Sequence, residues 1–208
     1  MINLKTSVWI GCIALAVSCQ EKKQVEVVQS SQNPDTVSVK NPAATPENLS
    51  PEDRISQIKN WYEDAQKGLA SSNKNCKNGD EKWKAKLDEK TSMEFTNTAK
   101  ICELENGIKV FSGEFNGYEY QQKFSYYFKG DQLFFVYYDS GAEACYDENR
   151  IYYDENTQPI QFLLKTNDCD GNEPKANKKI EDPKQQKALL KIVDEHMLQI
   201  KKILKMPA

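Results

Sequence analysis

Apolar residues at helical spacing predict a helix at each end of the folded region. The first helix follows Ser50 and Pro51, a favourable N-cap and a favourable first helical residue. Its apolar stripe consists of Ile55, Ile58, Trp61, Tyr62, Ala65 and Leu69. The second follows Asp182 and Pro183, and its stripe consists of Leu189, Leu190, Val193, Met197, Ile200 and Leu204. We therefore expect one helix over about 51–71 and another that closes the chain.

Between the two helices, turn signals alternate with aromatic segments and predict an antiparallel meander. Two-residue hairpin turns are expected at Asn106-Gly107, Asn116-Gly117 and Gly130-Asp131. Pairing outward from the three turns gives one common face, which holds Cys102, Phe111, Phe115, Tyr118, Tyr120, Phe124, Tyr126, Phe128, Leu133, Phe135 and Tyr137. Lys109 and Gln122 fall on the same face, which indicates a β-bulge. Two more strands are expected at about 144–153 and 159–168.

The segment between the first helix and the meander is polar. Residues 72–91 are rich in lysine, and we expect a short helical turn there, anchored by Trp83 and Leu87. The predicted architecture is α+β. It has an N-terminal helix, an antiparallel meander of about five to six strands and a C-terminal helix, with both helices packed on one face of the sheet.

This arrangement leaves a second aromatic face of the sheet without a helix. The side chains expected on it are Tyr127, Phe134, Val136, Tyr138 and Tyr153. Exposed patches of this composition mark sites for a partner or a ligand. The alternative is that polar neighbours or the N-terminal segment cover these side chains.

The first 19 residues have the pattern of an export signal. Lys5 supplies the positive start, and the apolar run Val8 to Val17 is shorter than the roughly 20 residues that a membrane-spanning helix needs. The run Leu15-Ala16-Val17-Ser18-Cys19 resembles the lipobox of bacterial lipoproteins. The resemblance implies cleavage before Cys19 and acyl chains on that cysteine. The alternative is an ordinary secretory signal that ends near an unrelated cysteine.

The lipoprotein resemblance also implies an address. The residue after Cys19 is Gln20 rather than aspartate, and in enteric members of the family this pattern directs the protein to the outer membrane. We therefore expect a lipid-anchored protein of the cell envelope that faces the periplasm or the cell surface.

The segment after the signal predicts a tether. Residues 20–50 are rich in Gln, Ser, Asn and Pro and contain no aromatic residue, so they cannot offset the entropy of ordering. The expected organisation is a signal peptide over 1–18, a lipidated cysteine and disordered tether over 19–49, and a single domain over 50–208.

The cysteines of an exported protein predict disulfides. Residues 145 and 169 are equidistant from residue 157 at the last predicted hairpin, so we expect Cys145 to pair with Cys169. Cys76 and Cys102 are the two other cysteines after Cys19, so by elimination they pair with each other. A zinc site is the alternative, but it would need closely spaced ligand pairs, which these cysteines lack.

Other polar groups suggest weaker candidate sites. Asp168, Asp170 and Asn172 alternate like the start of a calcium loop, but Glu173 and Lys179 stand where that loop needs glycine and glutamate. We therefore expect a polar turn there, no metal site and no cofactor. Carboxylates are abundant, and two of them could form a catalytic pair, but the sequence does not indicate which two. The candidates are Glu143, Asp147, Glu148, Asp154 and Glu155. The only histidine, His196, is expected at the edge of the apolar stripe of the last helix.

Charge and composition narrow the function classes. Residues 1–18 contain one basic residue and no acid, so their removal changes the net charge from -3 to -4, which disfavours nucleic acid as a partner. We expect a membrane-anchored, non-catalytic module that binds an envelope protein or a small ligand. The alternatives are an envelope hydrolase of glycans or peptides that uses a carboxylate pair, and a purely structural or stress-related surface protein.

Overall fold

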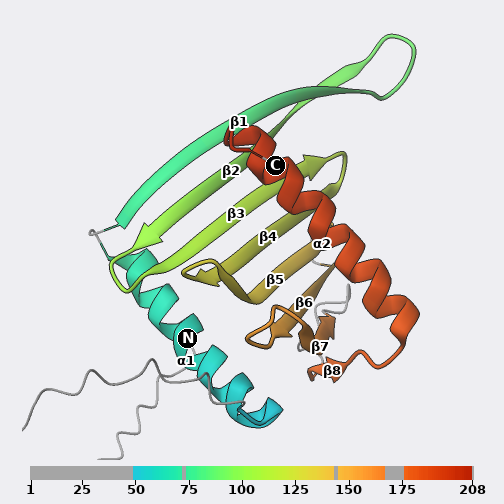
Figure 1. Ribbon diagram of the computed structural model, residues 1–208. Helices are drawn as coiled ribbons and strands as arrows, with labels where there is room; N and C mark the ends of the chain where they lie inside the picture. Colours follow the sequence, from blue (N-terminus) through green and yellow to red (C-terminus); the bar gives the residue numbers. More distant parts are fainter. Residues whose placement is uncertain (1–48, 72–73, 143–144, 167–175, 208) are drawn as a thin grey trace, which may run out of the picture. The chain divides into compact units, whose positions relative to one another are not determined.

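The fold is an eight-stranded antiparallel sheet with one helix before it and one after it (Figure 1). The computed structural model describes residues 49–71, 74–142, 145–166 and 176–207. The elements are α1 (Pro51–Ala70), β1 (Lys74–Lys86), β2 (Ser92–Leu104), β3 (Ile108–Gly117), β4 (Tyr120–Lys129), β5 (Gln132–Ala142), β6 (Cys145–Tyr153), β7 (Pro159–Thr166), β8 (Lys178–Lys179) and α2 (Pro183–Ile203). Each strand pairs with its neighbour in the chain, in the order β1 to β8. The α+β class and the antiparallel meander are confirmed.

Both helices begin where their capping residues predict. The Ser50 hydroxyl accepts a hydrogen bond from the Asp53 backbone N–H at 3.2 Å, and the Asp182 carboxylate accepts one from the Lys184 N–H at 3.0 Å. These bonds satisfy backbone donors that the first turn of a helix leaves without a partner. The apolar stripes then decide which side of each helix faces the sheet.

The expected number of five to six strands is too low. The polar segment predicted as a helical turn forms the edge strand β1, and β8 is a strand of two residues. Contacts across the β1–β2 hairpin explain why a lysine-rich segment is extended. Cys76 is disulfide-bonded to Cys102, and the Trp83 ring stacks on Phe95 with ring centroids 4.9 Å apart. Such cross-strand pairs stabilise a strand that has little apolar character of its own.

The helices pack on opposite faces of the sheet, so the expectation that both cover one face is wrong. One buried cluster joins α2 to strand residues that include Phe111, Tyr126 and Val136. The other joins α1 to Val110, Tyr127 and Phe135, which are the sequence neighbours of the first three. Because successive strand residues point to opposite faces, the sheet has two apolar faces. We call them the α2 face and the α1 face.

A bulge in the β4–β5 hairpin sets which aromatic residues share a face. Phe128 lies opposite Leu133, as expected, but the register shifts next to it and Tyr127 pairs with Phe135. Phe134 is the extra residue, and it packs under α1 together with Phe135. The sequence predicted a bulge without its position. The shift moves Phe135 and Tyr137 from the face on which they were expected to the α1 face.

The turns of the meander agree with the sequence at one of three places. Gly130 has φ +61° in the two-residue turn between β4 and β5, as expected. The turn after β2 has three residues and ends at Gly107, with φ +74°, so Cys102 pairs with Val110 instead of Phe111. Asn116 and Gly117 belong to β3, and the turn lies two residues later.

The β1–β2 hairpin extends beyond the rest of the sheet (Figure 1). The two strands pair along all of their 13 residues, but β2 pairs with β3 only from Thr98 to Glu103. The outer part of the hairpin is therefore a two-stranded ribbon, with no further strand beside it among the described residues.

Candidate functional site

The five side chains predicted to form an exposed binding surface are buried. Tyr127, Phe134, Val136, Tyr138 and Tyr153 are each at most 5% exposed. The first two lie in the cluster beneath α1 and the other three in the cluster beneath α2. The prediction of an exposed aromatic face is therefore wrong. One face was expected to be uncovered, but α1 covers one face and α2 covers the other.

The most suitable ligand site is a pocket between α1 and the α1 face of the sheet. It has a volume of about 510 Å³. Its lining residues are Ile58, Lys59, Tyr62, Glu63, Phe135, Tyr137, Glu148, Arg150 and Tyr152. We call it the α1 pocket. The helix provides one wall, and the central strands β5 and β6 provide the floor, so the site stands on rigid elements.

Aromatic rings form the apolar part of the α1 pocket. The Tyr62 ring meets Phe135 edge-on with ring centroids 5.2 Å apart, and Phe135 contacts Tyr152 at 5.0 Å. Burial raises the pKa of Tyr152, so its hydroxyl stays protonated at physiological pH. A ligand in this pocket would meet ring faces and edges from both the helix and the sheet.

Glu148 is the centre of the polar part of the pocket. One oxygen of its carboxylate accepts a hydrogen bond from Arg150 Nη2 at 2.9 Å, and the other accepts one from the Tyr137 hydroxyl at 3.1 Å. The Lys165 ammonium lies 3.5 Å away from the same carboxylate. The Glu148 side chain is 10% exposed, whereas those of Arg150 and Lys165 are 25% and 29% exposed. The cations therefore offer the accessible charge.

The tyrosine beside Glu148 is held in its donor form. Burial raises the pKa of Tyr137, and the nearby Glu148 charge raises it further. Asp139 lies directly opposite Glu148 on the neighbouring strand. Burial also raises the pKa of the Asp139 carboxyl, while the positive charge of Lys123 acts in the other direction.

A second hollow lies on the same face of the sheet, over β1 to β4, and its lining includes no residue of α1. It has a volume of about 540 Å³ and is more open than the α1 pocket. Its polar lining consists of Asn78, Asp80, Thr98, Lys100, Ser112, Glu114, Lys123 and Ser125. Acidic and basic side chains alternate there, as on a solvated sheet face, and the ring of the lining residue Phe124 packs on the opposite face, against His196.

His196 belongs to the packing between α2 and the sheet. Its ring stacks on Phe124 with centroids 4.0 Å apart, and its Nδ1–H donates to the Ile192 carbonyl at 2.8 Å. Nε2 lies 3.2 Å from Gln122 Oε1, and the Gln122 Nε2–H donates to the Tyr138 hydroxyl oxygen at 2.9 Å. Burial lowers the pKa of His196, which favours the neutral ring. These contacts give the histidine a structural role.

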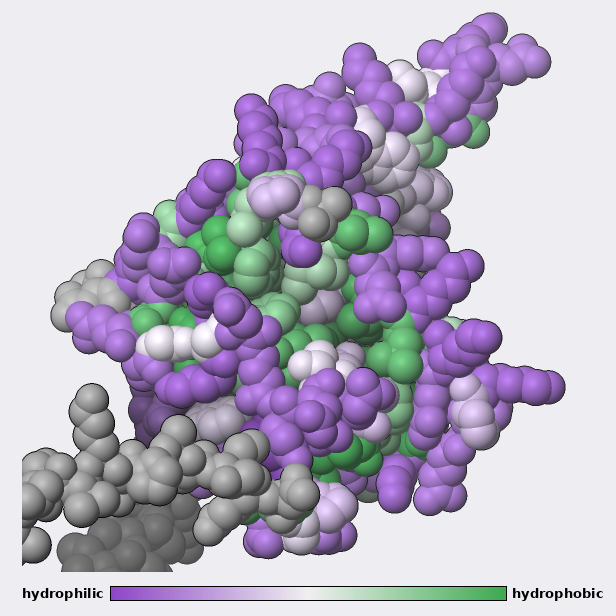
Figure 2. All heavy atoms as spheres, viewed as in Figure 1, coloured by the Kyte–Doolittle hydropathy of each residue, from purple (hydrophilic) through white to green (hydrophobic). Residues whose placement is uncertain are grey.

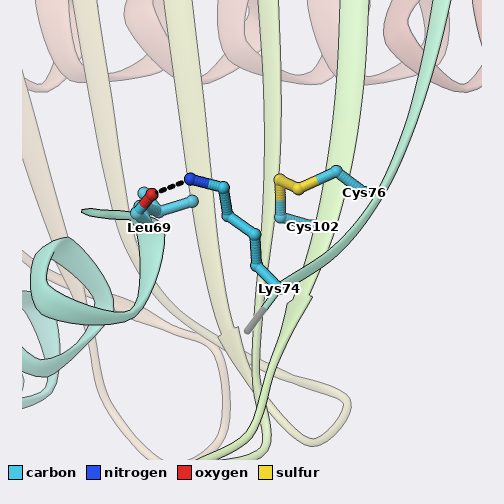
Figure 3. Close-up of a disulfide and its surroundings, with 4 residues drawn as sticks. All are labelled: Leu69, Lys74, Cys76 and Cys102. Atoms are coloured by element: carbon cyan, nitrogen blue, oxygen red, sulfur yellow. Dashed lines mark hydrogen bonds between the residues drawn. A yellow bond between two sulfur atoms is a disulfide. The ribbon is translucent and has the colours of Figure 1, made fainter. Parts of the chain in front are cut away.

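One of the two predicted disulfides is confirmed. Cys76 and Cys102 are bonded across β1 and β2, and Figure 3 shows Lys74 next to them, with its ammonium donating to the Leu69 carbonyl at the end of α1. Cys145 is also disulfide-bonded. Its predicted partner Cys169 lies outside the described residues, so this pairing stays a prediction.

Several other predicted sites lie outside the described part of the chain. They are the lipidation site Cys19 and the calcium candidates Asp168, Asp170 and Asn172. Within the described ranges, no group of three or more His, Cys, Asp or Glu side chains is placed to hold a metal ion. No helix in those ranges has the length and apolar character needed to cross a membrane.

Sequence reasoning did not identify the α1 pocket. It considered Glu148 only as one acid among many, and it did not single out Arg150. The signal was present, because Glu148 and Arg150 are two positions apart on one strand and so share a face. Recognising it requires the β5–β6 register, which places Tyr137 opposite Arg150. Comparison with protein-family models, with curated proteins and with solved structures finds no match to this chain.

Proposed function

We propose that this protein is a lipid-anchored, non-catalytic binding module of the bacterial cell envelope that holds a small amphipathic ligand in the α1 pocket. The observation that carries the proposal is the convergence of Tyr62, Phe135 and Tyr152 with the Glu148–Arg150 pair in one pocket of about 510 Å³. Small-molecule sites commonly combine an apolar lining with a few fixed polar groups in a pocket of this size.

The charges around the pocket favour a ligand with an anionic group. The Glu148 carboxylate faces two cations and a hydroxyl donor, so it is already satisfied. Arg150 retains guanidinium N–H donors, and Lys59 adds a second cation from α1. A ligand with an aromatic or aliphatic body and one carboxylate, sulfonate or phosphate would satisfy both parts of the site.

Attachment to the membrane is the second part of the proposal. It is supported by the lipobox-like run that ends at Cys19 and by the polar segment over 20–50 that follows. With acyl chains at one end and the domain at the other, the tether would have a root-mean-square reach of about 30 Å. Intact-mass analysis of the mature protein tests this part, since cleavage before Cys19 with added acyl mass is expected.

A hydrolase with a carboxylate pair is the alternative function. Glu63 and Glu148 both line the α1 pocket, which is the observation in its favour. Both oxygens of the Glu148 carboxylate are already engaged, one by Arg150 and the other by the Tyr137 hydroxyl. The group is therefore held by its neighbours instead of pointing free into the pocket, so we prefer binding to hydrolysis.

Blocking the pocket from its exposed rim tests the proposal. The probe is 8-anilinonaphthalene-1-sulfonate, whose rings and single sulfonate match the aromatic wall and the cations. Glu63→Trp places a large side chain over the pocket, and Asp64→Trp places the same side chain at an exposed neighbouring position outside the lining. We expect at least tenfold weaker probe binding by fluorescence titration for Glu63→Trp and unchanged binding for Asp64→Trp. Equal binding by both variants would refute the proposal.

A further inference from the structure

The strand β1 forms a long free edge of the sheet. It has 13 residues and, among the described strands, pairs only with β2, whereas the strand at the other edge, β8, has two residues. An edge strand presents a row of backbone N–H and C=O groups that another extended chain can pair with. No other backbone partner of β1 is found in the described part of the chain.

The hydrogen-bond pattern shows which residues of β1 have free backbone groups. At the end of the hairpin the Leu87 N–H donates to the Thr91 carbonyl at 2.9 Å, so odd-numbered positions are bonded to β2. The disulfide pair agrees, because Cys76 and Cys102 have Cα atoms 4.1 Å apart, the short spacing of a non-hydrogen-bonded pair. The N–H and C=O groups of even-numbered positions therefore point outward, away from β2.

Side chains divide in the same way between the two faces of β1. Cys76 packs in the α1-face cluster, so even-numbered positions lie on that side, and Lys82, Lys84 and Lys86 form a row on it. Lys82 pairs with Glu94 of β2 at 3.1 Å, and no ion pair of Lys84 or Lys86 is found among the described residues. Glu81 pairs with Lys202 of α2 at 2.8 Å, which places odd-numbered positions on the α2 face. Trp83, which is 38% exposed, and Ala85 lie on that side.

The charge of this edge selects its partner. Among the residues of β1 there are five lysines and two acids, a net charge of +3, in a chain whose net charge is -3. Like charges disfavour pairing of β1 with β1 of a second copy, since lysines on an edge strand oppose self-association. The projecting hairpin is mostly hydrophilic on the side seen in Figure 2.

We propose that β1 binds an extended acidic segment of a partner protein by strand addition. The backbone of that segment would pair with the outward groups of even-numbered positions from Cys76 to Lys86. Its acidic side chains, at alternate positions, would face the row of Lys82, Lys84 and Lys86. The side chains between them would be apolar and would pack beside Trp83. This site is separate from the α1 pocket, and neither proposal depends on the other.

The probe is a labelled heptapeptide that alternates valine and glutamate. Its fluorescence anisotropy is measured as the full chain is added. Lys84→Pro removes an outward-pointing N–H without removing a bond to β2, so the strand keeps its place while the edge is blocked. We expect at least tenfold weaker binding for Lys84→Pro at an unchanged melting temperature. The same peptide with N-methyl groups on alternate amides should bind at least tenfold more weakly to the unaltered protein.

Charge reversal tests the partner's chemistry separately. The double variant Lys84→Glu, Lys86→Glu should lose at least tenfold in affinity for the glutamate peptide and should prefer a peptide with lysine in place of glutamate. Lys184→Glu with Lys187→Glu, on the exposed start of α2, changes the net charge equally and should bind like the unaltered protein. Three results would overturn the proposal: no binding of the glutamate peptide, equal binding by Lys84→Pro, or a dimer of the unaltered protein that Lys84→Pro dissociates.

Discussion

Truncation of Phe134 to alanine tests the position of the bulge and the placement of α1 together. The Phe134 side chain is 0% exposed and meets Trp61 of α1 edge-on, with ring centroids 5.2 Å apart. Removal of a buried phenylalanine side chain costs about 3–5 kcal/mol, including the cavity it leaves. The edge-to-face contact with Trp61 accounts for about 0.5–1.5 kcal/mol of this loss. We therefore expect Phe134→Ala to lower the free energy of unfolding by about 4 kcal/mol.

Urea denaturation followed by circular dichroism measures this loss. Domains of ordinary stability unfold with about 5–15 kcal/mol, so the variant would be folded but clearly destabilised. Tyr118→Ala is the control, because Tyr118 is an aromatic residue of the same meander that is 55% exposed, and its truncation should cost less than about 0.5 kcal/mol. A loss below about 1 kcal/mol for Phe134→Ala would refute the bulge and the burial of this ring under α1.

Three other perturbations have defined outcomes. Replacing both Cys76 and Cys102 with alanine should lower the free energy of unfolding by about 3.5 kcal/mol, from the loop entropy of a 26-residue separation, and urea denaturation measures it. Gly79→Ala should lower the melting temperature, because a Cβ there would lie 2.6 Å from the Ile203 carbonyl oxygen; an unchanged melting temperature would contradict the close approach of α2 to β1. The pKa of His196 is lower in the folded protein than in the unfolded chain, so the unfolded chain binds a proton at a higher pH. The free energy of unfolding should therefore fall as the pH drops below about 6.5. Replacing His196 with glutamine should make the melting temperature depend less steeply on pH between about pH 6.5 and 5. An unchanged dependence would contradict this role of His196.

The helices and most strands could be predicted because their signals are local. Ser50 and Asp182 identify the helix starts through contacts within one turn. Gly130 identifies a hairpin because glycine readily adopts the positive φ that the turn needs. The strands at Cys145–Tyr153 and Pro159–Thr166 were expected within about two residues of their observed ends.

The face of each side chain could not be predicted because a single extra residue reverses it. Phe134 in the bulge moves Phe135 and Tyr137 to the α1 face, and the three-residue turn before Ile108 moves Cys102 there too. The strand β1 was missed because its pairing depends on contacts with β2 instead of on its own apolar pattern. The α1 pocket depends on all of these features, since its floor exists only in the observed register.

The most direct test of the binding pocket follows two isoleucine methyl groups by NMR during titration with 8-anilinonaphthalene-1-sulfonate. Ile58 lines the α1 pocket, whereas Ile200 is equally buried but lies beneath α2 on the opposite face of the sheet. Saturable movement of the Ile58 δ1 methyl signal with an unmoved Ile200 signal is the predicted result. Movement of Ile200 alone, or a titration in which neither signal moves, would contradict the assignment of the α1 pocket as the ligand site.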